Sequence, residues 1–291
     1  MIHPSAPNLD ERSHSVLKEA GESETLSAIA RRIRGVLVRM SHQANAPHLG
    51  SALSCVDILV AAYWAGLRVN PEDPTAPDRD RFILSKGHAA IALYATLAHR
   101  GFFPVSLLDT FGQPGSRLAE QPSPACVPGL ELATGSLGHG LSVGLGIAMA
   151  GRLHGYHYRV AVLMSDGECN EGSVWEAALF APVQGLEQVV AIIDYNRWQA
   201  TGRSNDIMAL APFKDKWAAF GWSAYEVDGH DLGALVSALR HVPDGTGKPV
   251  AIIAHTVKGK GISFMEDDND WHYRIPTAEQ LAWALQELGQ G

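Results

Sequence analysis

The chain has 291 residues, 46% hydrophobic and 19% charged, which provides for a sizeable core, and its net charge of −8 argues against nucleic acid as a partner. No apolar run approaches the ~20 residues of a membrane helix, and the N-terminus lacks an apolar signal core. Three widely separated cysteines, Cys55, Cys126 and Cys169, exclude a disulfide scaffold or a cysteine zinc site, so we expect a cytoplasmic protein.

The first part of the chain predicts an arm followed by helices and one strand. Residues 1–24 are polar and aperiodic, and we expect them to form an arm outside a single domain of residues 25–291. The later elements are recognised by apolar spacing and by the Gly and Pro residues that end them. They are a helix from Leu26 to Met40, a helix over Val56–Tyr63, a strand over Arg81–Leu84 and a helix from Ala89 to His99.

Residues 112–140 are rich in Gly and Pro and predict a long loop, a feature that function usually has to justify. Beyond this loop, helices alternate with continuous apolar strands. This alternation predicts an α/β fold, with a parallel sheet covered by helices on both faces. The strands are Val160–Met164, Val189–Asp194, Ser223–Val227 and Pro249–His255, and the helices are Leu141–Leu153, Ser173–Pro182, Phe213–Phe220, Leu232–Leu239 and Thr277–Leu288.

Polar residues follow two of these strands, where parallel sheets bind their ligands. Asp166 and Gly167 follow the first strand, and Asn196 stands thirty positions after Asp166, behind the second. A carboxylate, an amide oxygen and a backbone carbonyl, for example that of Trp198, suit Mg²⁺ and leave places for water and two phosphate oxygens. Gly167 would let a phosphate approach the backbone, and the helix near Ser173 would point its N-terminus there. Either segment alone would be an ordinary turn, but the pair predicts a metal and diphosphate site.

Five further motifs occur in a fixed order around this pair. They are Leu84–Ala89, Ala133–Gly140, Glu171–Ala177, Val227–Asp231 and Val257–Gly261. Together with the Asp166 and Asn196 segments, they resemble the N-terminal, diphosphate-binding half of transketolases, especially the form split over two chains. The resemblance extends from about Leu26 to Gly289 and implies a parallel-sheet thiamine diphosphate-binding fold with thiamine diphosphate and Mg²⁺ as cofactors.

The resemblance also implies an activity and a partner. The activity is transfer of a two-carbon ketol unit from a ketose donor to an aldehyde or related carbonyl acceptor. Only 30 residues follow Gly261, too few for the second α/β domain that completes the family's active site. We therefore expect a companion C-terminal-half subunit, an α₂β₂ assembly packed through Gly138–Ala150 and Val174–Ala181, and little activity of this chain alone. The alternatives are a deoxyxylulose-phosphate-synthase-like enzyme, a 2-oxo-acid-decarboxylating enzyme, or a non-catalytic paralogue.

Carried over position by position, the resemblance implies cofactor and metal ligands. Asp166, Asn196 and the carbonyl of Trp198 would bind Mg²⁺. The residues expected to lie against thiamine diphosphate are Gly135, Ser136, Leu137, Gly167, Glu168, Asn196 and His272.

The resemblance further implies four catalytic residues. His48 and His88 would flank the reacting carbon and contact the substrate, and His272 would lie between diphosphate and substrate. Imidazoles titrate near neutrality and suit the proton transfers of ketol chemistry. Glu171 matches a glutamate at the subunit contact that is linked to proton transfer between sites.

Three positions depart from the family's pattern. Ser165 replaces a glycine before Asp166, and His139 stands where the family commonly has glutamine. Gln121, followed by Pro122, matches a histidine that binds the donor's C1 hydroxyl. Glutamine can still form hydrogen bonds but cannot act as an acid or base, so we expect an altered donor site that still takes a C2 ketol.

Overall fold

The computed structural model describes the backbone of residues 9–123 and 126–291 and the side chains of residues 25–123 and 126–291, and its centre is a five-stranded sheet. Every neighbouring pair of strands is parallel, so all carboxyl ends lie at one edge. The order is β1-β2-β3-β5-β4, in which β5 is inserted between β3 and β4. The strands are β1 (Arg81–Leu84), β2 (Val160–Ser165), β3 (Val189–Tyr195), β4 (Ser223–Asp228) and β5 (Val250–His255).

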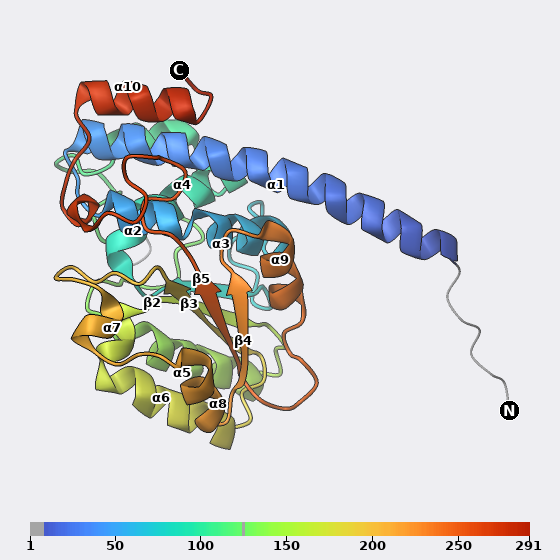
Figure 1. Ribbon diagram of the computed structural model, residues 1–291. Helices are drawn as coiled ribbons and strands as arrows, with labels where there is room; N and C mark the ends of the chain where they lie inside the picture. The colour runs from blue at the N-terminus through green and yellow to red at the C-terminus, as the bar shows by residue number, and fades with distance from the viewer. Residues whose placement is uncertain (1–8, 124–125) are drawn as a thin grey trace, which may run out of the picture.

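Helices cover both faces of this sheet, giving three layers (Figure 1). The layering follows from the strands themselves, because successive side chains point to opposite faces. In β2, Ala161 and Leu163 join one hydrophobic cluster, whereas Val160, Val162 and Met164 join the other. The first cluster contains α1 (Leu9–Ala44), α2 (Leu49–Ser54), α3 (Val56–Ala61), α4 (Ala90–Arg100), α9 (Leu232–Arg240) and α10 (Ala278–Glu287), and the second contains α5 (Gly140–Leu153), α6 (Gly172–Val183) and α8 (Phe213–Ala219).

The predicted α/β class and parallel sheet are confirmed, and the predicted helices and strands are present within a few residues of their predicted ends, except that the first helix begins at Leu9 instead of Leu26. The elements that the sequence did not predict are short and lie mostly beside the carboxyl edge of the sheet. They are α2, α7 (Ser204–Ile207), the π-helical turn η1 (Ala62–Gly66) and the 3₁₀ turns η2 (Gly87–Ala89), η3 (Val105–Thr110), η4 (Gly167–Asn170) and η5 (Asn269–His272). Such one-turn elements carry too little periodicity to be recognised.

The N-terminus differs from the expected aperiodic arm. Helix α1 begins at Leu9, so the backbone of residues 9–24 is helical and extends beyond the other layers (Figure 1). The sequence lacks proline between Pro7 and Pro47, and an established helix extends readily through such a stretch. Residues 1–8 of the expected arm lie outside the described residues. Within the described part of the chain, no helix is both long and apolar enough to cross a membrane.

Candidate active site

The ends of β2 and β3 bring the two predicted polar segments together. Ser165 of β2 pairs with Asp194 of β3, and Asp166 directly follows β2. The Asp166 Oδ2 atom accepts a hydrogen bond from the backbone N–H of Arg197 at 2.9 Å. The Asp166 carboxylate therefore lies against the turn that contains Asn196 and Trp198.

Asp166 is a fully buried carboxyl group without a cationic hydrogen-bond partner among the described residues. Its donors are neutral: the hydroxyl of Ser204 at 2.8 Å and the N–H groups of Gly167 and Arg197, each at 2.9 Å. Burial raises the pKa of Asp166 to about 7, opposed by the Ser204 hydrogen bond and assisted by the nearby charge of Asp194. Buried charges are normally paired or bound to metal, so this carboxylate fits a cation.

The donor set beside Asp166 decides which kind of metal would fit. No group of three or more His, Cys, Asp or Glu side chains suited to a metal occurs among the described residues. A metal here would need amide, carbonyl, water or phosphate oxygens, and Mg²⁺ accepts such ligands. Asn196 is buried beside this site, and its Oδ1 atom accepts from the N–H of Trp198 at 3.0 Å. The residues present therefore fit Mg²⁺ better than a transition metal.

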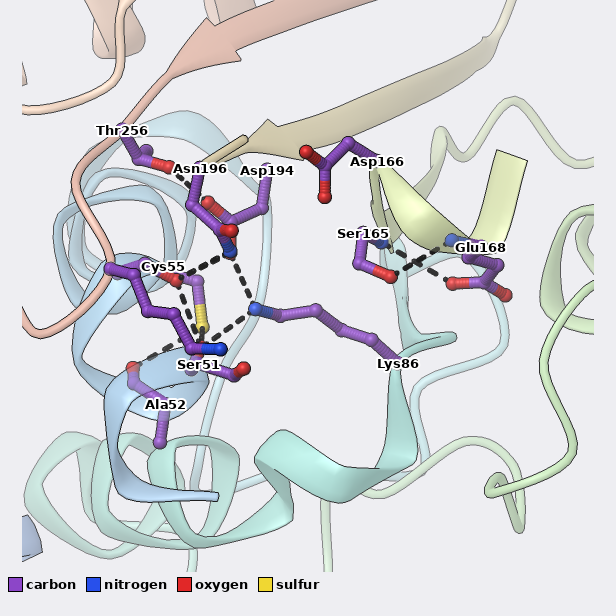
Figure 2. A network of polar contacts seen from close by, with 12 residues as sticks. Ser51, Ala52, Cys55, Lys86, Ser165, Asp166, Glu168, Asp194, Asn196 and Thr256 are labelled. Atoms are coloured by element: carbon purple, nitrogen blue, oxygen red, sulfur yellow. Dashed lines mark hydrogen bonds and ion pairs between the residues drawn. The ribbon is translucent and has the colours of Figure 1, made fainter. Parts of the chain in front are cut away.

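A buried ion pair lies next to Asn196 (Figure 2). Lys86 and Asp194 are fully buried and meet at 2.5 Å, and Asp194 also accepts from the hydroxyls of Ser54 and Thr256. Burial opposes both charges, but their mutual attraction lowers the pKa of Asp194 and raises that of Lys86. The Asn196 Nδ2 atom donates to Asp194 at 3.4 Å, which turns the amide oxygen away from this network.

Glu168, expected to contact the cofactor, is buried among protein donors. Its carboxylate accepts from the Ser85 hydroxyl, from the N–H of Gly138 at 2.9 Å and from the N–H of Ser165 at 3.3 Å. Ser165, one of the three departures, accepts from the N–H of Glu168 at 3.1 Å through its hydroxyl oxygen. Glu168 thus fastens the loop after Leu137 to the ends of β1 and β2.

The loop that holds Gly135, Ser136 and Leu137 packs directly on the segment after β1. A Cβ atom at Gly87 would lie 2.6 Å from the carbonyl carbon of Thr134, so the two backbones touch. Gln121 reaches this loop as well, because its Oε1 atom occupies the place that a Cβ at Gly135 would need. Gln121, Gly135, Ser136 and His139 line a common pocket.

Three buried polar atoms around the carboxyl edge of the sheet have no hydrogen-bond partner among the described residues. They are Thr134 Oγ1 in the glycine-rich loop, Asn170 Oδ1 and Gln199 Nε2. Gln199 packs against Gly167, because its Cγ atom lies 3.0 Å from the position that a Cβ at Gly167 would take. Unsatisfied buried groups usually have an absent partner, so a polar ligand beside Gly167 fits them.

Three predicted catalytic histidines form one cluster. His48 lies at the start of α2, His88 in η2 and His272 at the end of η5. Their ring centroids are 5.5 Å apart for His48 and His88, 5.2 Å for His48 and His272, and 6.1 Å for His88 and His272. Burial lowers the pKa of each, to about 3 for His272, where Lys258 adds to the effect. All three are therefore neutral near pH 7, and each can both donate and accept a proton.

Lys258 was not predicted as a site residue, although it lies in the Val257–Gly261 motif. It is fully buried, and its Nζ atom contacts Asn269 Oδ1 at 2.7 Å and His272 Nδ1 at 3.0 Å. Burial lowers the pKa of Lys258 to about 8, so the ammonium form still predominates near pH 7. With Nδ1 accepting from this ammonium, the ring proton of His272 is assigned to Nε2. A buried ammonium whose close contacts are neutral fits an anionic ligand.

Glu171 and Trp198 occupy the periphery. Glu171 is solvent-exposed at the start of α6, against Gly138 of the glycine-rich loop. The Trp198 indole N–H donates to Asp267 at 2.8 Å, and Arg203 stacks 3.7 Å above its ring. The structure thus gathers the expected metal, cofactor and histidine positions at one edge of the sheet and leaves Glu171 on an open surface.

Comparison with known proteins identifies the family of this chain. The family described as transketolase, thiamine diphosphate binding domain, matches residues 25–290. The chain belongs to this family. The resemblance drawn from the motifs is thereby confirmed, as is the thiamine diphosphate-binding fold.

Two relatives are transketolase subunits of similar length. The chain is 43% identical over 267 residues to one subunit of the apulose-4-phosphate transketolase of Phocaeicola vulgatus, covering 92% of this chain and 95% of that protein. It is 40% identical over 241 residues to one subunit of the 6-deoxy-6-sulfo-D-fructose transketolase of a Clostridium species, covering 83% and 88%. The solved transketolase of Campylobacter jejuni superposes with a TM-score of 0.86 at 29% identity, covering 91% of this chain. The chain spans only 43% of that longer chain.

Proposed function

We propose that this chain is the N-terminal subunit of a two-chain transketolase that depends on thiamine diphosphate and Mg²⁺. It transfers a two-carbon ketol unit from a ketose donor to an aldehyde or related carbonyl acceptor. The observation that carries this proposal is the buried Asp166 carboxylate, whose hydrogen-bond donors among the described residues are all neutral and which lies beside Asn196 at the same edge as three neutral histidines. The names of the two subunit relatives support it.

Asp166, Asn196 and the carbonyl of Trp198 would bind Mg²⁺. The cofactor would lie against the Gly135–Leu137 segment and Gly167, where Thr134 and Gln199 have unsatisfied polar atoms among the described residues. The Lys258 ammonium would attract its diphosphate. Thiamine diphosphate, when bound, supplies the carbon nucleophile for the donor's carbonyl group.

The histidines move protons around the substrate. His48 and His88 accept a proton from the donor's hydroxyl group and return one to the alkoxide that forms on the acceptor. They can do so because burial keeps them neutral. His272, with Nδ1 engaged by Lys258, donates from Nε2 and orients the substrate. Gln121 forms hydrogen bonds with the donor end of the substrate from the pocket beside Gly135.

A companion C-terminal-half subunit completes the site in an α₂β₂ assembly. Glu171 is exposed, as a residue awaiting a subunit contact would be. Leu179, Phe180 and Val183 of α6 are 59%, 43% and 82% exposed, and apolar side chains grouped in this way mark interaction surfaces. The three cysteines are buried and unpaired, which supports a reducing, cytoplasmic location.

The metal site provides the test. In the complex with the companion chain, Asp166→Ala should weaken thiamine diphosphate binding in the presence of Mg²⁺ by about tenfold to a hundredfold, the scale of an altered metal shell. Calorimetry measures the dissociation constant, and the exposed Asp215→Ala in α8 is the matched control. An unchanged affinity of the Asp166→Ala complex would rule out the metal site.

A further inference from the structure

The segment Val257–Gly261 after β5 carries Lys258 and is fixed through its backbone. The N–H of Gly259 donates to the carbonyl of Gly50 at 3.0 Å, and the N–H of Asp267 donates to the carbonyl of Lys258 at 2.9 Å. The Lys258 side chain crosses Gly50, where a Cβ would lie 3.2 Å from its Cγ atom. The position of the Lys258 ammonium therefore depends on where this short segment is held.

His230, in the turn between β4 and α9, contacts this segment from the other side. The N–H of Val257, the residue before Lys258, donates to His230 Nε2 at 2.9 Å. His230 Nδ1 lies 2.7 Å from Asp57 Oδ2 in α3. Because Nε2 accepts a hydrogen bond, the ring proton is on Nδ1 and is donated to Asp57. His230 therefore donates a hydrogen bond to Asp57 from Nδ1 and accepts one from Val257 at Nε2.

Asp57 also fixes the far end of the segment through Arg34 of α1. Arg34 donates to both Asp57 oxygens, at 3.1 Å and 2.5 Å, and its Nε atom donates to the carbonyl of Lys260 at 3.0 Å. Asp57 and Arg34 are 5% and 7% exposed. Burial alone would raise the pKa of Asp57, but the His230 hydrogen bond and the charge of Arg34 outweigh it, so the pKa is lowered and the carboxylate persists.

We propose that His230, oriented by Asp57, is a positioning residue that sets the place of Lys258, and through Lys258 the anion affinity of the site. The inference rests on the proposed function, because it assigns the anion to thiamine diphosphate. His230 touches neither cofactor nor substrate. It acts through the Val257 N–H, and the Asp57–Arg34 pair supports the same segment at Lys260.

Two substitutions separate the two bonds of His230. In His230→Gln, the side-chain oxygen can reach the place of Nε2 and still accept from Val257, while the bond to Asp57 is lost. In His230→Asn, the amide nitrogen takes the place of Nδ1 and still donates to Asp57, while Val257 loses its acceptor. Each variant loses one hydrogen bond, so a purely structural role would affect both alike. His154→Asn, an exposed histidine just after α5, is the matched control.

The experiment measures thiamine diphosphate affinity, with Mg²⁺ present, by calorimetry on the complex with the companion chain. We expect His230→Asn to raise the dissociation constant about tenfold or more, as loss of an outer partner of a binding group does, and His230→Gln to stay within about threefold. Equal dissociation constants in the two folded variants would overturn the proposal. If His230→Asn does not fold, the folded His230→Gln complex decides: near-normal affinity supports the proposal, and a tenfold loss overturns it.

Hydrogen exchange in the cofactor-free chain provides a second readout that does not depend on the enzyme's function. The Val257 amide should exchange about tenfold faster in His230→Asn than in His230→Gln, because only the former leaves it without an acceptor. Equal exchange in the two variants would overturn the role of His230. If the unmodified complex binds no thiamine diphosphate, the proposed function fails, while the exchange result still reports on the contact of His230 with Val257.

Discussion

Lys258 and His272 meet at 3.0 Å between two loops, and each changes the chemistry of the other. The buried ammonium keeps a proton off the histidine, and the histidine nitrogen partly solvates the ammonium. Asp166 would be stabilised by a cation, because its buried carboxylate accepts hydrogen bonds from neutral donors. At the residue scale, Lys86 and Asp194 thus compensate each other's charge, whereas Asp166 and Lys258 have only neutral hydrogen-bond partners among the described residues and remain available to charged ligands.

The shifted pKa of His272 predicts a pH dependence of stability. Its pKa is near 6.5 in the unfolded chain and about 3 in the folded one, so the unfolded chain binds more protons between these values. The free energy of unfolding should therefore fall as the pH drops below about 6.5, and His272→Asn should reduce this fall. For the half-buried ring we expect a difference of about 1 kcal/mol, or about 2–4 °C in Tm, between pH 7 and pH 5.

Thermal unfolding of the cofactor-free chain at the two pH values measures this difference, and His154→Asn on an exposed position is the control. Parallel Tm profiles for His272→Asn and the unmodified chain would contradict the assigned neutral state of His272.

Gln121 predicts a change in donor preference. Gln121 lies against Gly135 and lines the pocket that also contains Ser136 and His139. Gln121→His would introduce an acid–base group, so turnover with hydroxyketone donors should rise about tenfold, less than the about 10²–10⁴-fold of a fully positioned general acid–base group, relative to donors lacking that hydroxyl. Steady-state kinetics with paired donors gives the ratio, and an unchanged ratio counts against a donor-binding role.

At the scale of elements, the site depends on two loops whose backbones touch at a glycine, where any larger residue would collide with the other loop. The segment after β1 touches the Ala133–Gly140 loop at Gly87, and Glu168 ties the same loop to the end of β2. Rigid strands thus hold the glycine-rich loop at two points. The long loop, which the sequence predicted from its Gly and Pro content, is fixed at Gly135 and Gly138 rather than left free.

Gly87→Ala tests this close approach. The added Cβ would lie 2.6 Å from one backbone atom of Thr134 and 2.7 Å from the N of Gly135, so the loop has to move. We expect a loss of stability of about 1–3 kcal/mol and a weaker affinity for thiamine diphosphate. Gly146→Ala in α5 is the control for stability, because nothing lies within 4 Å of its Cβ. Equal Tm values for the two variants would show that the loops are not in contact.

At the scale of the whole molecule, α5 and α6 lie on one face of the sheet (Figure 1). Several of their apolar side chains are exposed. Leu153 and Val183 are 84% and 82% exposed. The relatives named as subunits have nearly the length of this chain, whereas the solved transketolases are more than twice as long. Both observations favour a surface that is covered in an assembly.

The assembly prediction concerns this face. An obligate interface of this kind buries more than about 2,000 Å², so a charge at its centre should be disruptive. Leu179→Asp should weaken self-association and association with the companion chain by about tenfold or more, whereas Val105→Asp, exposed on η3, should not. Sedimentation velocity measures both, and the companion chain should restore ketol transfer to the unmodified chain. Full ketol transfer by this chain alone would contradict the split-enzyme interpretation.

The sequence by itself determined the layers and the edge at which chemistry takes place. Continuous apolar strands with polar residues behind them require a covered parallel sheet, and ordered motifs such as Ser165–Gly172 place carboxylate and amide groups at its carboxyl edge. These features are local, so periodicity and spacing carry them. His48, His88 and His272 could be named because the segments around them resemble those of the transketolase family.

Only the tertiary structure decided which distant side chains share a contact. Lys258 lies beside His272, and His230 lies beside Val257, because β5 is inserted between β3 and β4 and brings the segment after it against α1, α2 and the β4–α9 turn. The order of the inner strands is not specified by any local pattern, since β2, β3 and β5 have the same apolar, buried character. The pKa values of Asp166 and Lys258 likewise depend on burial by residues far away in the chain. The sequence could therefore name Asp166 and His272, but only the packing of the strands added Lys258 and His230 and set the charges and partners of all four.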